Sequence, residues 1–101
     1  MEETSESVQA KVLWLFRKFL SKGGIEIGFD EGFTVNDVRS NSFLRGLEDK
    51  FGIEIPEEDA LRLDVGSYDV SRGLFVYVPR GVVHYIEGRV VPDWRASTLL
   101  T

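Results

Sequence analysis

The sequence of 101 residues contains no cysteine and only one histidine, His84. The absence of cysteine excludes disulfides, thiolate metal sites and cysteine nucleophiles, and a single histidine excludes a multi-histidine metal cage. No apolar run approaches the roughly 18 residues of a membrane-spanning helix. The acidic start at residues 1–6 lacks the basic and apolar stretches of a signal peptide. We therefore expect a single cytoplasmic domain without a membrane span and without a metal site.

Charge is the most informative part of what the sequence does contain. Twelve basic residues stand against seventeen acidic ones, which gives a formal net charge of −5 and argues against nucleic acid as a partner. The acidic excess is concentrated between Glu48 and Asp64, where only Lys50 and Arg62 are basic. Such a patch can attract the basic surface of a partner protein, or it can be an ordinary solvated face.

Hydrophobic periodicity predicts a first helix over residues 5–22, because apolar side chains recur at helical steps and Gly23–Gly24 follows. Residues 23–40 carry several glycines between apolar anchors and are predicted to be a long loop packed onto the helices. Three of these anchors alternate as in a short strand, but a strand without a partner is unstable. The loop is therefore the preferred interpretation.

The second predicted helix begins at Ser42, with Asn41 as its N-cap, because the apolar stripe starts only at Phe43. A start one or two turns earlier, capped by Thr34, is the alternative. Gly52 ends the helix in either case.

Proline marks the start of a short third helix. Residues 53–55 are predicted to be extended, since a residue before proline avoids the helical region. From Pro56 to about Leu63 a short helix follows, with three acids in its first turn, where the helix dipole favours negative charge.

The C-terminal third has two interpretations. By residue propensity, segments 74–78 and 82–86 are the two strands of a β-hairpin. By spacing, the same apolar residues form one face of two helical pieces, the second of which Pro79 opens. The first interpretation gives a small α+β domain, and the second gives a helical bundle.

No catalytic signature accompanies these elements. Ser42, His84 and Asp37 can be combined into a triad only on paper, because the chain has neither a Gly-x-Ser-x-Gly elbow nor a glycine-rich oxyanion loop. A phosphate-binding glycine loop is absent from the sequence as well. The sequence therefore predicts that the protein is not an enzyme.

One segment is more specific than the rest. Leu47–Ala60, with the sequence LEDKFGIEIPEEDA, resembles the acyl carrier protein family, in which an acidic helix turns through a Phe-Gly-Ile-Glu-Ile-Pro stretch into a short acidic helix. The order of predicted elements is similar over residues 8–88, and Val82–Ile86 resembles the last helix of the family. Residues 64–79 are extra, as in the longer, specialised carriers.

The resemblance implies an all-α fold and favours the helical interpretation of the C-terminal third. The expected architecture is an acyl-carrier-like bundle of four or five short helices with a long first loop. One domain is expected over residues 1–101, with its core at about 5–88 and a tail at 89–101.

The resemblance also implies a function. Carriers of this family hold an acyl group on a 4′-phosphopantetheine arm, which is attached to a serine at the start of the second helix. A helix N-terminus suits the phosphodiester of the arm, because it offers free N–H groups. The implied protein is a monomeric carrier for lipid or secondary-metabolite synthesis. A phosphopantetheinyl transferase would load it, and acyl-transfer or synthase enzymes with basic patches would dock on Glu48 and Asp49.

Two alignments place the attachment serine differently. Counting back from Phe51 without a gap puts Asp37 at the serine position, where no arm can attach. Matching the loop instead puts Asn41 at the cap and makes Ser42 the candidate phosphopantetheine site, at the expense of a shorter second helix. The first alignment implies an arm-less protein that serves as a binding or scaffold module, and the second implies a true carrier.

Overall fold

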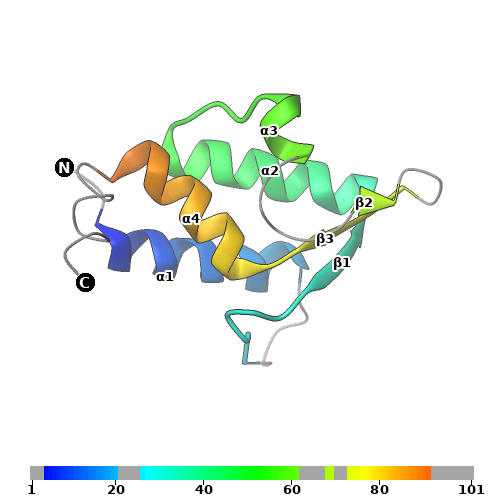
Figure 1. The fold of residues 1–101 in the computed structure, drawn as a ribbon, viewed down its shortest axis with the longest axis horizontal. Helices are drawn as coiled ribbons and strands as arrows, with labels where there is room; N and C mark the ends of the chain where they lie inside the picture. The colour runs from blue at the N-terminus through cyan, green and yellow to red at the C-terminus, as the bar shows by residue number, and fades with distance from the viewer. Residues whose placement is uncertain (1–3, 21–25, 62–67, 70–72, 92–101) are drawn as a thin grey trace.

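The computed structural model describes residues 4–20, 26–61, 68–69 and 73–91. The elements in chain order are α1 (Ser5–Leu15), the π-helical continuation η1 (Phe16–Leu20), β1 (Phe33–Asn36), α2 (Asp37–Phe51), α3 (Glu57–Leu61), β2 (Tyr68–Asp69), β3 (Leu74–Tyr77) and α4 (Pro79–Val90). Figure 1 shows α1, α2 and α4 packed together, α3 on the side of α2 away from α1, and the strands at one end of the helices. The fold is therefore α+β.

A capping box starts α1. The Thr4 hydroxyl accepts a hydrogen bond from the Ser7 backbone N–H at 3.1 Å, and the Ser7 hydroxyl accepts one from the Thr4 N–H at 3.0 Å. The buried stripe of α1 continues without a break into η1, where Phe16 and Leu20 are buried. The first predicted helix is thus present through Leu20, and the rest of its predicted range lies outside the described residues.

Helix α2 begins at Asp37 and not at Ser42. The Asn36 side chain accepts a hydrogen bond from the Arg39 N–H at 3.0 Å, so Asn36 is the N-cap, and the predicted cap at Asn41 is wrong. The buried face of the helix includes Ser40, which is 1% exposed. A stripe traced through apolar residues alone misses this polar position, and with it the first turn of the helix.

The C-terminal end of α2 is at Gly52, as predicted. Gly52 has φ 63°, a left-handed conformation that side chains with a Cβ adopt at a cost. The Ile53 N–H then bonds to the Glu48 carbonyl at 3.1 Å, which satisfies one of the free carbonyls at the helix end.

The strands form an antiparallel sheet in the order β1-β3-β2. In β1 and β3, Phe33 pairs with Tyr77 and Val35 with Phe75, and in the register of β2 with β3 Tyr68 pairs with Phe75. The expected all-α bundle is therefore wrong. The predicted loop contains β1, a Phe-Thr-Val run of high strand propensity, and this run supplies the partner that segment 74–77 needs.

Each interpretation of the C-terminal third is correct for one half. Residues 74–77 are a strand, as in the hairpin interpretation, but 82–86 lie in α4 and do not pair with them. Pro79 is the first residue of α4. Proline has no backbone N–H, and at this position an N–H would have no acceptor within the helix. Helix α4 continues to Val90, beyond the expected core boundary at residue 88, and residues 92–101 of the expected tail lie outside the described residues.

The core joins the helices to the sheet through aromatic rings. Phe16 of η1 meets Phe43 of α2 edge to face at 4.9 Å between ring centroids, and Phe43 meets Tyr77 of β3 at 5.2 Å. Val82 and Ile86 of α4 are completely buried against this cluster. The sheet is thus part of the core and holds the start of α2 in place.

Helix α2 approaches α1 and η1 closely at Gly46. A Cβ at this glycine would lie 2.8 Å from Phe19 Cε2 and 3.2 Å from Leu15 Cδ2. Because glycine has no Cβ, α2 can pack against α1 and η1 at this short distance.

Candidate functional site

The N-terminus of α2 is the place where the resemblance puts the attachment serine, and a carboxylate occupies it. Asp37 is the first helical residue, next to the Asn36 cap. Its Oδ2 lies 3.0 Å from the point where a Cβ on Gly73 would be, so the carboxylate packs against the backbone just before β3. Helix α2 therefore begins at Asp37, the residue that the ungapped alignment puts at the serine position.

The serines of α2 lie inside the helix and differ in environment. Ser40 is buried, and its hydroxyl lies 2.6 Å from the Tyr77 hydroxyl. Ser42, the candidate attachment site, is exposed in the second turn of α2. The helix N-terminus that would favour the phosphodiester is therefore not at Ser42, although its side chain is accessible.

The Ser40–Tyr77 pair is a buried polar contact between α2 and β3. Burial raises the pKa of Tyr77, and the hydrogen bond with Ser40 offsets this only in part. The phenol therefore stays neutral at physiological pH and can donate to Ser40. Sequence reasoning missed this pair because its members are 37 residues apart.

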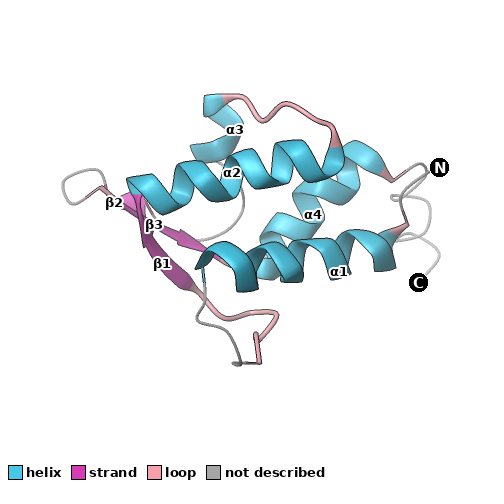
Figure 2. Ribbon diagram, turned by 180° about the vertical axis from the view of Figure 1, so that it is seen from behind, coloured by secondary structure: helices cyan, strands magenta, loops and turns pink. Residues whose placement is uncertain are grey.

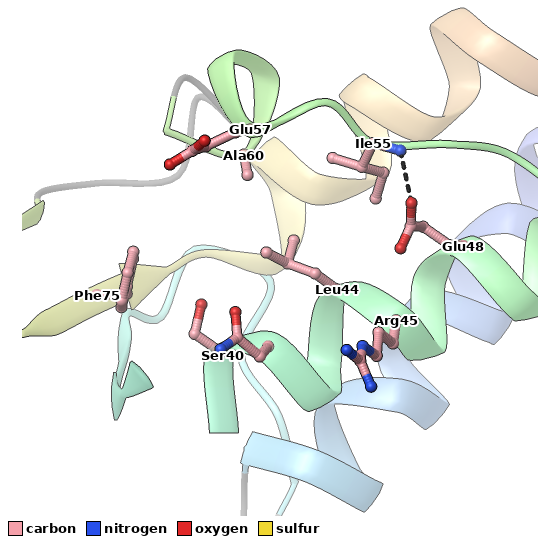
Figure 3. Close-up of a pocket in the computed structure, with 9 residues that line it drawn as sticks. Ser40, Leu44, Arg45, Glu48, Ile55, Glu57, Ala60 and Phe75 are labelled. Carbon is pink, nitrogen blue, oxygen red and sulfur yellow. Dashed lines mark hydrogen bonds between the residues drawn. The ribbon is translucent and has the colours of Figure 1, made fainter. Parts of the chain in front are cut away.

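A pocket of about 450 Å³ opens between α2, α3 and β3. Figure 3 shows Leu44 at its centre, Phe75 on the strand side, and Glu57 with Ala60 above it. The lining combines apolar side chains with two carboxylates and one guanidinium, and consists of Ser40, Asn41, Leu44, Arg45, Glu48, Ile55, Glu57, Ala60 and Phe75. An apolar floor with charged edges suits an amphipathic group.

The two predicted docking residues, Glu48 and Asp49, are neighbours in α2 but have different roles. Glu48 Oε2 accepts a hydrogen bond from the Ile55 N–H at 2.9 Å, drawn as a dashed line in Figure 3, and is partly buried. Asp49 is exposed. Glu48 therefore holds the connection between α2 and α3, and Asp49 is the more accessible of the two.

Another acid of this region, Asp59, connects α3 to α4 through a hydrogen bond and an ion pair. Its Oδ2 accepts a hydrogen bond from the Tyr85 hydroxyl at 2.7 Å and forms an ion pair with Arg89 at 3.5 Å. Arg89 also donates to the Glu54 carbonyl at 3.1 Å. Burial, followed by the hydrogen bond to Asp59, raises the pKa of Tyr85 to about 12.

The other acids in the C-terminal half of α2, in α3 and in their connection are exposed, and they are here called the acidic face: Asp49, Glu54, Glu57 and Glu58. It borders the pocket through Glu57. Sequence reasoning found the acidic region, but it could not separate the acids that serve the fold from those that face solvent.

Among the described residues, no group of three or more potential ligands is placed to hold a metal ion, and no helix is long and apolar enough to cross a membrane. Comparison with protein-family models, curated proteins and solved structures gives no match for the chain.

Proposed function

We propose that this chain is a binding module that resembles an acyl carrier in its helix order but lacks the phosphopantetheine arm. The observation that carries the proposal is Asp37 at the first position of α2, with Asn36 as the cap. A carboxylate there cannot accept the arm, and the other side chain that packs inward from this turn, Ser40, has its hydroxyl paired with Tyr77.

The binding surface of this module is the pocket together with the acidic face. The pocket offers Leu44, Ile55 and Phe75 as apolar contacts, and the carboxylates beside it favour a basic partner. An amphipathic segment with lysine or arginine next to large apolar residues fits both features. Acyl-transfer or synthase enzymes with basic patches remain the expected partners, and the cytoplasm remains the expected location.

Docking can be tested with a short amphipathic peptide built from lysine and leucine at helical spacing. We expect Glu57→Gln/Glu58→Gln to weaken its binding about tenfold, because two carboxylates of the acidic face are lost. The control is Glu6→Gln/Glu26→Gln, which removes the same charge from exposed positions elsewhere. Equal weakening by both pairs would mean that only the net charge matters, and it would refute a defined docking surface.

A true carrier, loaded at Ser42, is the second candidate function. The exposure of Ser42 on α2 supports it, because a transferase needs access to the hydroxyl. It requires the arm to leave from the second turn of the helix and not from its N-terminus. The two candidates differ in one covalent modification, and the mass of the loaded protein separates them.

A further inference from the structure

A second surface of the molecule is basic and aromatic, and the proposed function does not use it. Its centre is Trp14 of α1, whose side chain is 47% exposed. Only one other large apolar residue among those described, Val38, is classed as exposed. Tryptophan is costly to leave in water and is enriched where protein surfaces bind partners.

Two lysines from different elements converge on the Trp14 ring. The Lys18 ammonium of η1 lies 4.9 Å from the ring centroid, and that of Lys50, in the last turn of α2, lies 4.6 Å from it. Both distances are within the range of a cation–π interaction. Neither ammonium forms an ion pair with a described residue. The ring therefore holds two positive charges close together that the described part of the chain leaves without a counter-ion.

This surface and the acidic face are carried largely by different helices. Arg17, exposed on η1, adds a further positive charge beside Lys18. In both Figure 1 and Figure 2, α1 lies on one side of α2 and α3 on the other. Asp49 of the acidic face precedes Lys50 in α2, so the two surfaces are neighbours at the end of this helix. In a chain of net charge −5, such a concentration of positive charge is a local feature.

The occupant of this surface must be anionic, and its class follows from the ring. If Trp14 were inserted into a bilayer, the Lys18 and Lys50 ammonium ions would either leave the ring or enter the bilayer with it. Entering the bilayer would remove the water around each charge, which costs free energy. Nucleic acid needs a larger set of phosphate contacts than Arg17, Lys18 and Lys50 supply. Carboxylates on a polypeptide can instead approach the ammonium ions from solvent, and the ring has already restricted the lysine side chains, which lowers the entropy cost of binding.

We propose that Trp14, Arg17, Lys18 and Lys50 form a docking site for an acidic segment of a partner protein. The site is distinct from the pocket and the acidic face, and the proposal does not rest on the proposed function. A module with both surfaces can hold a basic partner and an acidic partner at the same time.

Trp14 fluorescence tests the proposal directly. The chain has two tryptophans, so Trp94→Phe leaves Trp14 as the only one. We expect a short glutamate-rich peptide to change the Trp14 emission with saturation, and a lysine-rich peptide of equal length to leave it unchanged. Lys18→Gln and Lys50→Gln should each weaken binding about threefold, and the double variant about tenfold.

The matched control is Arg39→Gln, which removes one exposed positive charge from the first turn of α2. It should change the affinity for the glutamate-rich peptide by less than about twofold, since charges remote from the site are screened by salt. The proposal is overturned if the peptide does not bind or if the double lysine variant binds as well as its parent. Tighter binding of anionic phosphatidylserine vesicles or of duplex DNA than of the peptide would also overturn it, in favour of a membrane or nucleic-acid surface.

Discussion

The two ends of α2 are held in different ways, although they belong to one helix. At the C-terminal end the hydrogen bonds involve nearby residues: Gly52 turns the chain, and Glu48 accepts the Ile53 N–H on its carbonyl and the Ile55 N–H on its side chain. At the N-terminal end the Asn36 cap is local, but Ser40 depends on Tyr77 of the sheet. The start of the helix therefore depends on a hydrogen bond to the sheet, whereas the hydrogen bonds described at its end come from nearby residues.

The largest expected effect comes from removing the sheet residue that supports the start of α2. Tyr77→Ala deletes a ring that is 1% exposed and in contact with Phe43, and should lower the free energy of unfolding by about 3–5 kcal/mol. Urea unfolding followed by circular dichroism measures this. A loss below about 1 kcal/mol would contradict the view that the sheet supports the helix.

The hydroxyl contact alone can be tested by a double-mutant cycle. Tyr77→Phe leaves the buried Ser40 hydroxyl without its partner and should cost about 1–2 kcal/mol. Adding Ser40→Ala should recover part of this, because no polar group is then left unpaired. Strictly additive losses in the cycle would show that the two hydroxyls do not interact.

Hydrogen exchange sharpens the same comparison. In Tyr77→Phe the amides in the second turn of α2, near Phe43, should exchange faster, while those near Lys50 keep their protection relative to global unfolding. Uniform acceleration along the helix would mean that its two ends are not independent.

The C-terminal end can be weakened separately. Gly52→Ala places a Cβ at φ 63° with no other atom within 4 Å, so the expected loss of about 1 kcal/mol comes from backbone strain alone. Asn36→Ala, which removes the N-cap, should cost a similar amount, about 1 kcal/mol. Thermal unfolding of both variants measures this, and an unchanged Tm for Gly52→Ala would contradict the left-handed cap.

The smallest expected effect concerns the hydrogen bond between Tyr85 of α4 and Asp59 of α3. Burial and the contact with Asp59 raise the folded-state pKa of Tyr85 to about 12, above the ordinary value for tyrosine of about 10. The raised pKa of Tyr85 stabilises the folded state fully at pH values below the pKa of tyrosine in the unfolded chain. This stabilisation is lost as the pH rises through the folded-state pKa, because the phenol ionises first in the unfolded chain. Tyrosinate absorbance against pH should show a titration near pH 12 that Tyr85→Phe removes, which assigns it among the three tyrosines. A Tyr85 pKa close to 10 would contradict the contact with Asp59.

These contrasts explain which features the sequence could predict. The stop at Gly52, the short acidic α3 and the start of α4 at Pro79 are encoded by neighbouring residues, and all three were predictable. The start of α2 was not, because Ser40 is polar and its partner lies in a distant strand. The β1–β3 pairing was missed for a similar reason. Each strand is short, and the residues near one strand in the sequence do not indicate that the other strand pairs with it.

The candidate site was predictable to the same extent. The acidic region stands out in the sequence, whereas the division between Glu48, which holds the α2–α3 connection, and the exposed Asp49 needs the fold. The choice between Asp37 and Ser42 depended on where α2 begins, and the Asn36 cap places that point before Asp37.

Whether the module lacks an arm is tested most directly by the intact mass of the protein after incubation with coenzyme A and a promiscuous phosphopantetheinyl transferase. Asp37→Ser, which restores a serine at the start of α2, and Ser42→Ala serve as matched variants beside a known carrier as the positive control. We expect no added mass for the parent. A gain of one phosphopantetheine by the parent that Ser42→Ala abolishes would contradict it and make the protein a true carrier.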